Sequence, residues 1–173
     1  MFSGDFSVTL DDMGRISLPR RLREMLNTNN VILTKHVDGC LWLFTIDGWK
    51  KFEKDIFGNT SQFSAQDLAL RRRFSPTELD IDKQGRILVA QTLRDHAKLS
   101  KDCIILGQHD YFEIWAEDRY KAYLEATEEL FRAASEKLDA KIKREKELSG
   151  NGDSSHAGSI GTDYAVSVPE GES

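Results

Sequence analysis

The chain contains one pattern of residues twice, and this repeat limits the folds that it can adopt. Residues 11–24 and 82–95 both fit D-x-x-G-R-I-x-[LV]-x-x-x-L-R-[ED], at an offset of 71 positions. A match of this length indicates two copies of one structural unit. The corresponding residues are Asp11 and Asp82, Gly14 and Gly85, and Arg15 and Arg86.

Each copy begins with a predicted strand, turn, strand and helix. Apolar and polar residues alternate over residues 6–10 and 15–18, which predicts two short strands. Gly14 lies where a tight turn needs a positive φ, and Asp11 can accept hydrogen bonds from the turn backbone. Pro19 favours the first position of a helix, which the apolar spacing extends to Leu26.

A second predicted hairpin completes each copy. Residues 31–33 match residues 104–106, and residues 41–44 match residues 112–115, as apolar strand segments. Each copy is therefore a ββαββ unit of about 45 residues, too small to bury much core alone, so we expect the two copies to share one core. The predicted connections are a two-residue turn at Asp38-Gly39 and a loop near Gln108–Asp110.

The segments outside the two copies are predicted to be helical or disordered. Apolar spacing predicts a helix over residues 49–57, and Ser64 resembles the N-cap of a second helix over residues 68–74. After Trp115 a narrow apolar stripe predicts one long helix, which needs one partner surface on its own subunit or on a neighbour. The chain is rich in Gly, Ser and Asp from residue 149, so we expect a disordered tail there.

Basic residues are concentrated locally, although the net charge of the chain is −5. Four carboxylates and no Lys or Arg follow residue 149, so the rest of the chain carries a net charge of −1. Basic side chains cluster in both repeats, and DNA binding depends on such local patches more than on the total charge. The run Arg71-Arg72-Arg73 fits a solvated face or pairing with nearby acidic groups; contact with phosphate or with another subunit is the alternative.

Several other classes of protein are disfavoured. No apolar run approaches the roughly 20 residues that cross a bilayer, and the N-terminus lacks signal-peptide features, so we expect a cytoplasmic protein with no membrane partner. Cys40 and Cys103 form no C-x-x-C pair, so buried positions are expected rather than a disulfide or a metal site. The chain has no Walker A, H-E-x-x-H or G-x-S-x-G motif, and neither His36 nor His109 has a nucleophile or carboxylate pair beside it. We therefore expect no enzyme, no cofactor and no small-molecule substrate.

The two copies resemble the MraZ family of bacterial transcriptional regulators, which carry two tandem SpoVT/AbrB-type modules. The resemblance rests on the two D-x-x-x-R turns and on residues 82–88 and 112–115, and it covers residues 1–122. It implies an α+β fold in which two tandem ββαββ AbrB-like modules with swapped hairpins form one shared split β-barrel. The implied parts are module 1 (5–49), a helical connector (50–76), module 2 (78–121), a C-terminal helix (117–148) and a disordered acidic tail (149–173).

The resemblance also implies that the two turns bind double-stranded DNA. Family members use the D-x-x-x-R turns for DNA binding, and a guanidinium group can hold phosphate or read guanine, so Arg15 and Arg86 are the expected contacts. The alternative is that each Asp–Arg pair is only a scaffold salt bridge. Expected helpers at the DNA are Arg20, Arg21 and Lys83, and the residues expected to shape and orient the turns are Asp11, Gly14, Asp82 and Gly85.

A repressor of the division and cell-wall gene cluster that contains its own gene is the implied function, with association to the nucleoid. Family members form closed rings of identical subunits, and their operators are direct repeats in the promoter, so successive subunits could read successive repeats. Two positions depart from the family pattern: Met13 replaces a Lys, and Ala90 replaces a Pro that would favour a helix start. The two modules are therefore expected to contribute unequally to DNA binding.

Two other functions are compatible with parts of the sequence. The DNA-binding half of a toxin–antitoxin pair predicts one module and a toxin-binding tail, whereas this chain has two modules. A structural ring or partner-binding scaffold without specific DNA recognition would use the basic residues for assembly. For the acidic tail we favour an inert solubilising role, and competition with DNA for the basic surface is the alternative.

Overall fold

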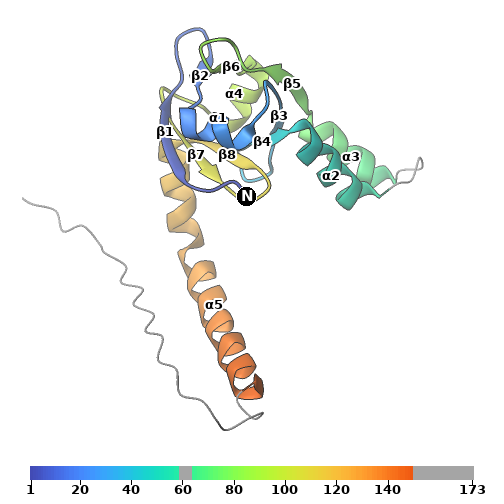
Figure 1. The fold of residues 1–173 in the computed structure, drawn as a ribbon, viewed down its shortest axis with the longest axis vertical. Helices are drawn as coiled ribbons and strands as arrows, with labels where there is room; N and C mark the ends of the chain where they lie inside the picture. Colours follow the sequence, from blue (N-terminus) through green and yellow to red (C-terminus); the bar gives the residue numbers. More distant parts are fainter. Residues whose placement is uncertain (59–63, 150–173) are drawn as a thin grey trace, which may run out of the picture. The chain divides into compact units, whose positions relative to one another are not determined.

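The part of the chain that the structure describes, residues 1–58 and 64–149 of a computed structural model, contains eight strands and five helices (Figure 1). The first copy forms β1 (Asp5–Thr9), β2 (Arg15–Ser17), α1 (Arg20–Leu26), β3 (Asn30–Lys35) and β4 (Leu41–Thr45). The second copy forms β5 (Thr77–Asp80), β6 (Arg86–Leu88), α4 (Gln91–Ala97), β7 (Asp102–Gly107) and β8 (Phe112–Ala116). Between the copies lie α2 (Ile46–Phe57) and α3 (Ala65–Phe74), and α5 (Glu117–Ser149) follows β8.

The two copies exchange strands. One antiparallel sheet has the order β1-β7-β8-β4-β3-β5, and β2 pairs with β6 in a second sheet. β1 of the first copy therefore pairs with β7 of the second, and β5 of the second copy pairs with β3 of the first. Each copy thus contributes its first strand to the other copy, while β3–β4 and β7–β8 form the predicted second hairpins within a copy.

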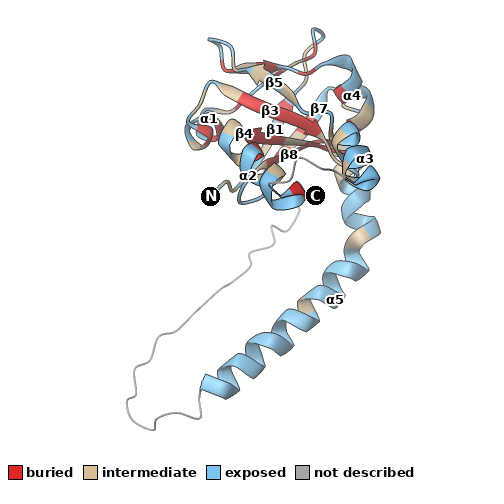
Figure 2. Ribbon diagram, turned by 90° about the vertical axis from the view of Figure 1, so that its right-hand side faces the viewer, coloured by how far each residue is buried: buried red, intermediate tan, exposed pale blue. Residues whose placement is uncertain are grey.

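Both copies contribute to one apolar core. Ile16 of β2 lies opposite Ile87 of β6, and both side chains are fully buried. Figure 2 shows that the buried residues gather on the strands of the sheet. The expected shared core is therefore present. Its fully buried members also include Leu22, Leu33, Leu41 and Leu43 from the first copy and Leu93, Ile105, Phe112 and Ile114 from the second.

Side-chain caps explain why the two connecting helices begin earlier than predicted. The hydroxyl group of Thr45 accepts a hydrogen bond from the backbone N–H of Gly48 (3.0 Å), so α2 begins at Ile46. Ser64 and Asp67 form a capping box, in which each side chain accepts a hydrogen bond from the other residue's backbone N–H. Such caps satisfy N–H groups that have no partner within the helix.

The short helices α1 and α4 start in the same way although only one of them has a proline. Pro19 precedes α1 with φ and ψ of −54° and 146°, and Ala90 precedes α4 with −57° and 148°. The backbone at this position is therefore set by the fold in the second copy, and the missing proline does not prevent the helix.

Two details of the predicted hairpins are wrong. The connection between β3 and β4 has three residues, Val37–Gly39, instead of two, because the N–H of His36 donates to the carbonyl oxygen of Cys40 (3.0 Å). Gly39 takes a φ of +81°, which suits the glycine of a three-residue hairpin loop.

The alignment of the two copies is also shifted by one residue after the short helices. Val31 pairs with Thr45 in the first copy, and Cys103 pairs with Ala116 in the second. Thr45 and Ala116 occupy equivalent positions, so Cys103 corresponds to Val31. The sequence comparison had instead matched Ile104 with Val31. The register of strand pairs, and not apolar character alone, fixes this correspondence.

The long C-terminal helix is present as α5, within which the chain divides into two compact units, one ending at Thr127 and the other beginning at Glu128. Among the described residues, no helix is both long enough and apolar enough to cross a membrane. Ser149 ends α5, and the rest of the predicted disordered tail, residues 150–173, lies outside the described residues.

The shared core predicts a large effect of one substitution in the shortest sheet. Ile87→Ala removes a fully buried side chain between the copies and should lower the free energy of unfolding by about 2–5 kcal/mol in urea denaturation. Leu88→Ala in the same strand is the control, because Leu88 is 57% exposed and should change stability by about 0.5 kcal/mol at most. A small effect of Ile87→Ala would show that β2 and β6 do not belong to the core.

Candidate nucleic-acid interface

The first D-x-x-x-R turn, residues 11–15, connects β1 to β2 and is closed by one carboxylate. Asp11 Oδ1 accepts hydrogen bonds from the backbone N–H groups of Met13 (2.9 Å) and Arg15 (2.8 Å). Asp11 Oδ2 accepts a hydrogen bond from Arg15 Nε (2.8 Å). Gly14 supplies the positive φ of +79° that the turn requires, and its N–H donates to the carbonyl oxygen of Asp11 (2.9 Å). The aspartate therefore holds both the turn and the arginine.

The second turn, residues 82–86, repeats this geometry between β5 and β6. Asp82 Oδ1 accepts from the backbone N–H groups of Gln84 and Arg86 (both 2.9 Å), and Asp82 Oδ2 accepts from Arg86 Nε (2.8 Å). Gly85 has a φ of +77°, and its N–H donates to the carbonyl oxygen of Asp82 (2.8 Å). Met13 and Gln84 occupy equivalent places and contribute only backbone groups to these bonds, so the Met13 departure leaves the turn intact.

Hydrogen bonding keeps both turn carboxylates ionised. The pKa of Asp11 is lowered chiefly by the hydrogen bond from the Arg15 backbone N–H, and partial burial opposes this shift. The pKa of Asp82 is lowered in the same way by the Arg86 backbone N–H. Within the described part of the chain, the two guanidinium groups use Nε for the carboxylate and make no hydrogen bond through their Nη atoms. The Nη groups therefore remain available as donors.

The pairing of β2 with β6 brings the two turns to the same end of the first unit (Figure 1). Arg15 lies opposite Leu88, and Arg86 lies opposite Ser17. The arginine side chains are 35% and 26% exposed, respectively. Both are thus partly covered and partly accessible at the surface.

Each turn is also fastened to the other copy. The N–H of Leu18 donates to the carbonyl oxygen of Gly85, and the N–H of Val89 donates to that of Gly14 (both 2.9 Å). These reciprocal bonds hold each glycine turn against the strand of the opposite copy.

Two helix arginines cover the same glycines. A Cβ atom at Gly14 would lie 2.7 Å from Arg94 Cζ, and one at Gly85 would lie 2.7 Å from Arg23 Nε. Each helix arginine therefore packs on the turn of the other copy. The sequence contained a signal for this contact, the Leu-Arg pair that recurs at the end of both repeats, but the contact itself joins distant segments and was not predicted.

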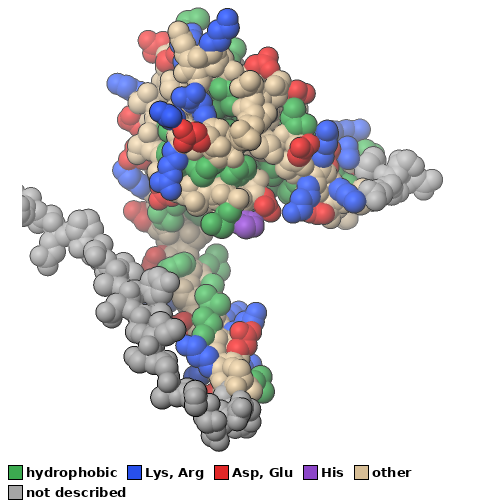
Figure 3. Space-filling view, viewed as in Figure 1, with side chains coloured by type: hydrophobic (Ala, Val, Ile, Leu, Met, Phe, Trp, Pro, Cys, Tyr) green, Lys and Arg blue, Asp and Glu red, His purple; other side chains and the backbone are tan. Residues whose placement is uncertain are grey.

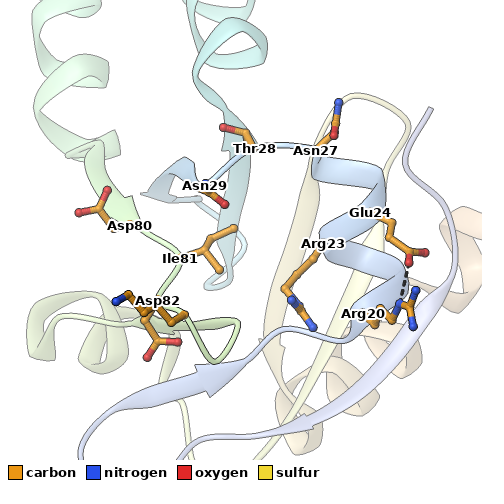
Figure 4. A pocket seen from close by; sticks show the side chains of 10 residues that line it. Arg20, Arg23, Glu24, Asn27, Thr28, Asn29, Asp80, Ile81 and Asp82 are labelled. Atoms are coloured by element: carbon orange, nitrogen blue, oxygen red, sulfur yellow. Dashed lines mark hydrogen bonds and ion pairs between the residues drawn. The ribbon is translucent and has the colours of Figure 1, made fainter.

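The three predicted helper residues lie in different surroundings. Arg20 is exposed, and its Nε pairs with Glu24 (2.8 Å). Lys83 and Arg21 are also exposed. Arg20 and Lys83 line one open groove of about 780 Å³ together with Glu24 and Asp82, whereas Arg21 is not among its lining residues. Figure 4 shows that the groove lies between α1 and the segment that leads into the second turn.

Charges of both signs occur around the turns. The groove contains Arg20, Arg23 and Lys83, but also Glu24, Asp80 and Asp82. Figure 3 likewise shows Lys and Arg interspersed with Asp and Glu on the visible face of this end. The surface is therefore not a uniformly basic face, and any preference for an anion has to come from individual side chains.

The triple arginine of α3 divides into one paired and two exposed residues. Arg71 pairs with Glu53 (3.6 Å), and its guanidinium carbon lies 4.6 Å from the centre of the Phe57 ring. Arg72 and Arg73 are exposed. Pairing with a nearby acidic group therefore explains Arg71.

Among the described residues, no cluster of three or more His, Cys, Asp or Glu side chains could hold a metal ion. Cys40 and Cys103 are free and buried, as predicted. Burial raises the pKa of Cys40 and raises that of Cys103 to about 11, so both are thiols at neutral pH.

Comparison with known proteins gives matches over most of the chain. A family model described as "MraZ protein, putative antitoxin-like" matches residues 1–72 and 75–141. A protein of Treponema denticola is 45% identical over 138 residues, which are 79% of this chain and 96% of the relative. Relatives from Treponema pallidum subsp. pallidum and Oenococcus oeni are 41% and 37% identical over 139 and 141 residues, which cover 79% and 80% of this chain and 93% and 96% of the relatives.

All three relatives carry the name Transcriptional regulator MraZ. The family match includes both repeats, both D-x-x-x-R turns, most of the connecting helices and part of α5. The chain therefore belongs to the MraZ family.

Proposed function

We propose that this protein is a transcriptional regulator that binds double-stranded DNA through its two D-x-x-x-R turns. The observation that carries this proposal is the identical construction of the two turns at one end of the unit, each with an arginine held by a carboxylate through Nε. The names of its relatives support a regulatory role. The Nη groups of Arg15 and Arg86 would then donate to phosphate or guanine.

The charge of the turns assigns different tasks to different residues. Each Asp–Arg pair is neutral overall, so it supplies fixed donors and little net attraction for DNA. Salt-dependent affinity depends on the number of phosphates that cations neutralise, and we assign that part to Arg20, Arg21 and Lys83. Asp11 and Asp82 would orient the arginines, and the glycines would keep the turns narrow.

One subunit offers few contacts, so we further propose that several subunits act together. Subunits in a closed ring would place successive turn pairs on successive direct repeats of a promoter, which raises affinity through effective concentration. In this proposal the target is the division and cell-wall gene cluster that contains the protein's own gene, the effect is repression, and the protein is cytoplasmic and associated with the nucleoid.

We infer that the two modules, residues 5–49 and 78–121, form one split β-barrel with swapped hairpins. This inference is supported by the exchange of β1 and β5 between the copies and by the pairing of β2 with β6. Residues 50–76 would then act as a helical connector and residues 117–148 as a C-terminal helix outside the barrel.

The first test compares wild type with an Arg15→Ala/Arg86→Ala variant by fluorescence anisotropy. The probes are a labelled fragment from upstream of the protein's own gene and a scrambled fragment, each titrated at two salt concentrations. We expect the variant to lose at least about tenfold in affinity for the upstream fragment and to lose its preference over the scrambled one.

The control for this test removes two exposed positive charges elsewhere, in Lys50→Ala/Lys54→Ala on α2. This control should retain the preference for the upstream fragment. If the arginine variant binds both fragments as wild type does, the turns are scaffold and the DNA contacts lie elsewhere. If wild type itself binds neither fragment, the protein is a ring or partner-binding scaffold.

A second prediction tests whether the packing of Arg94 against Gly14 contributes to DNA affinity. Gly14→Ala should reduce both stability and affinity for the upstream fragment, because it combines a positive φ with a clash at 2.7 Å. Gly58→Ala is the matched control, since Gly58 has a φ of +66° but nothing within 4 Å of the added atom. Equal affinities of the two variants would contradict the proposed importance of the contact.

A third prediction concerns pH. Because hydrogen bonds lower the pKa of Asp11 and Asp82 in the folded state, their stabilising effect is complete well above the ordinary value of about 3.9 and is lost as the pH falls through the folded value. The Asp11→Asn/Asp82→Asn variant should therefore lose less stability than wild type between pH 7 and pH 3, measured by urea denaturation. An identical loss in both proteins would contradict this account.

A further inference from the structure

We propose that a pocket beside α3 binds a nucleotide, with the phosphates on basic side chains at its rim and the base against its apolar floor. This α3 pocket has a volume of about 540 Å³, which lies within the usual range for sites of small organic ligands. It is formed by the end of β3 and the loop after it, the last residues of α3, and α4. No residue of the two D-x-x-x-R turns lines it, and the proposal does not rest on the DNA-binding role.

Hydrogen bonds between elements fix the walls of the α3 pocket. The hydroxyl group of Thr34 donates to the carbonyl oxygen of Phe74 (2.6 Å), which ties the end of α3 to β3. The ring nitrogen Nε2 of His96 lies 2.7 Å from the carbonyl oxygen of His36, which ties α4 to the end of β3. The pocket is therefore formed before a ligand arrives, and little ordering is needed on binding.

The helix that closes the pocket is not part of the duplicated fold. α2 follows β4 and α5 follows β8 at equivalent places in the two copies, whereas α3 occurs only between the copies. None of the residues of α3, Ala65–Phe74, is buried. Packing of the shared core therefore does not explain the side chains that this helix presents to the pocket.

Three cations without an ion pair border the pocket. They are Lys35 at the end of β3 and Arg72 and Arg73 at the end of α3. Within residues 1–58 and 64–149 none of the three forms an ion pair, in contrast to Arg71, which pairs with Glu53. Guanidinium and ammonium groups hold phosphate through charge-assisted hydrogen bonds, so this rim suits a ligand with more than one negative charge.

No carboxylate neutralises these cations from within the pocket. Among the described residues, no Asp or Glu lines it. The carboxylates next to its lining residues in sequence are Asp38 and Asp95, and each has another partner. Asp38 Oδ2 lies 3.4 Å from His36 Nδ1, and Asp95 Oδ1 accepts a hydrogen bond from Gln91 Nε2 (2.6 Å). An anion that enters the pocket therefore meets basic groups and no competing acid.

The floor of the pocket is apolar and partly open to water. Val37 is 87% exposed and Leu70 is 47% exposed, and Phe74 lies one helical turn after Leu70, on the same side of α3. The flat face of a nucleobase can pack on aliphatic and aromatic side chains of this kind. The floor therefore suits the base of a ligand whose phosphates lie at the rim.

Two histidines favour a nucleobase over the acyl chain of a lipid phosphate. His36 and His96 both line the pocket. Among the described residues, His36 Nε2 and His96 Nδ1 make no hydrogen bond. Burial lowers the pKa of His36, so its ring is neutral at neutral pH and can donate or accept a hydrogen bond. The edge of a base offers such partners, whereas an acyl chain offers none.

Isothermal titration calorimetry of the full-length protein, without DNA and without added Mg²⁺, tests the proposal. The probes are ATP, GTP, adenosine and inorganic tripolyphosphate. We expect at least one of the two nucleotides to bind at least about tenfold more tightly than adenosine or tripolyphosphate, because only a nucleotide contacts both the rim and the floor.

Variants separate the rim from the floor. Arg72→Ala/Arg73→Ala changes two exposed residues and should weaken nucleotide binding at least about tenfold. Leu70→Asn should weaken nucleotide binding but leave that of tripolyphosphate unchanged. Lys50→Ala/Lys54→Ala on α2 removes two exposed positive charges outside the pocket and should bind nucleotide as wild type does. Far-ultraviolet circular dichroism of every variant checks that the helices are retained.

Three results would overturn the nucleotide site. They are failure of wild type to bind either nucleotide, binding of tripolyphosphate as tight as that of both nucleotides, and unchanged nucleotide binding by Arg72→Ala/Arg73→Ala. Tighter binding of a short-chain lysophosphatidic acid than of either nucleotide would assign the pocket to a lipid phosphate and would also overturn the proposal. Arg15 and Arg86 are intact in every variant, so the anisotropy assay tests DNA contact separately, and its failure would leave the nucleotide result standing.

Discussion

The pairing of β2 with β6 is the contact on which both the core and the candidate site depend. It places Ile16 against Ile87 in the middle of the core, where neither copy could bury enough apolar surface alone. The same pairing continues into the bonds from Leu18 to the Gly85 carbonyl and from Val89 to the Gly14 carbonyl. The strand pairing that builds the core therefore also holds the two turns in place.

The two turns are alike in their hydrogen bonds but not in the arginines that cover them. Arg23 Nε donates to the carbonyl oxygen of Leu18 (3.2 Å), whereas Arg94 Nε is buried and lacks a hydrogen-bond partner in the described part of the chain. A buried donor without a partner destabilises its surroundings by roughly 1–3 kcal/mol. This difference lies beneath the Gly14 turn, whereas the backbone at Met13 and Ala90 follows that of the other copy. The unequal contribution of the two modules to DNA binding stays a prediction.

Local signals predicted the elements, while contacts between the copies could not be derived from either copy alone. The repeat, the glycine turns and the short helices follow from spacing and from the demand for a positive φ. The start of α2 at Ile46 depends on a cap by Thr45, the last residue of a strand, so the apolar pattern from Trp49 placed it too late. Arg23 and Arg94 resemble ordinary solvated helix residues in sequence, because the glycines that they cover belong to the other copy. The aspartate and arginine of each turn were found from sequence because their contact is local, at i and i+4.

The neutrality of each Asp–Arg pair explains why assembly and DNA recognition would need one another. A surface that mixes acidic and basic groups gains little from long-range attraction, particularly in a chain with a net charge of −5. The fold instead places two guanidinium groups per subunit accurately, and such placement contributes more to specificity than to affinity. Weak but well-oriented contacts become effective when identical subunits are linked, because each bound subunit raises the effective concentration of the next.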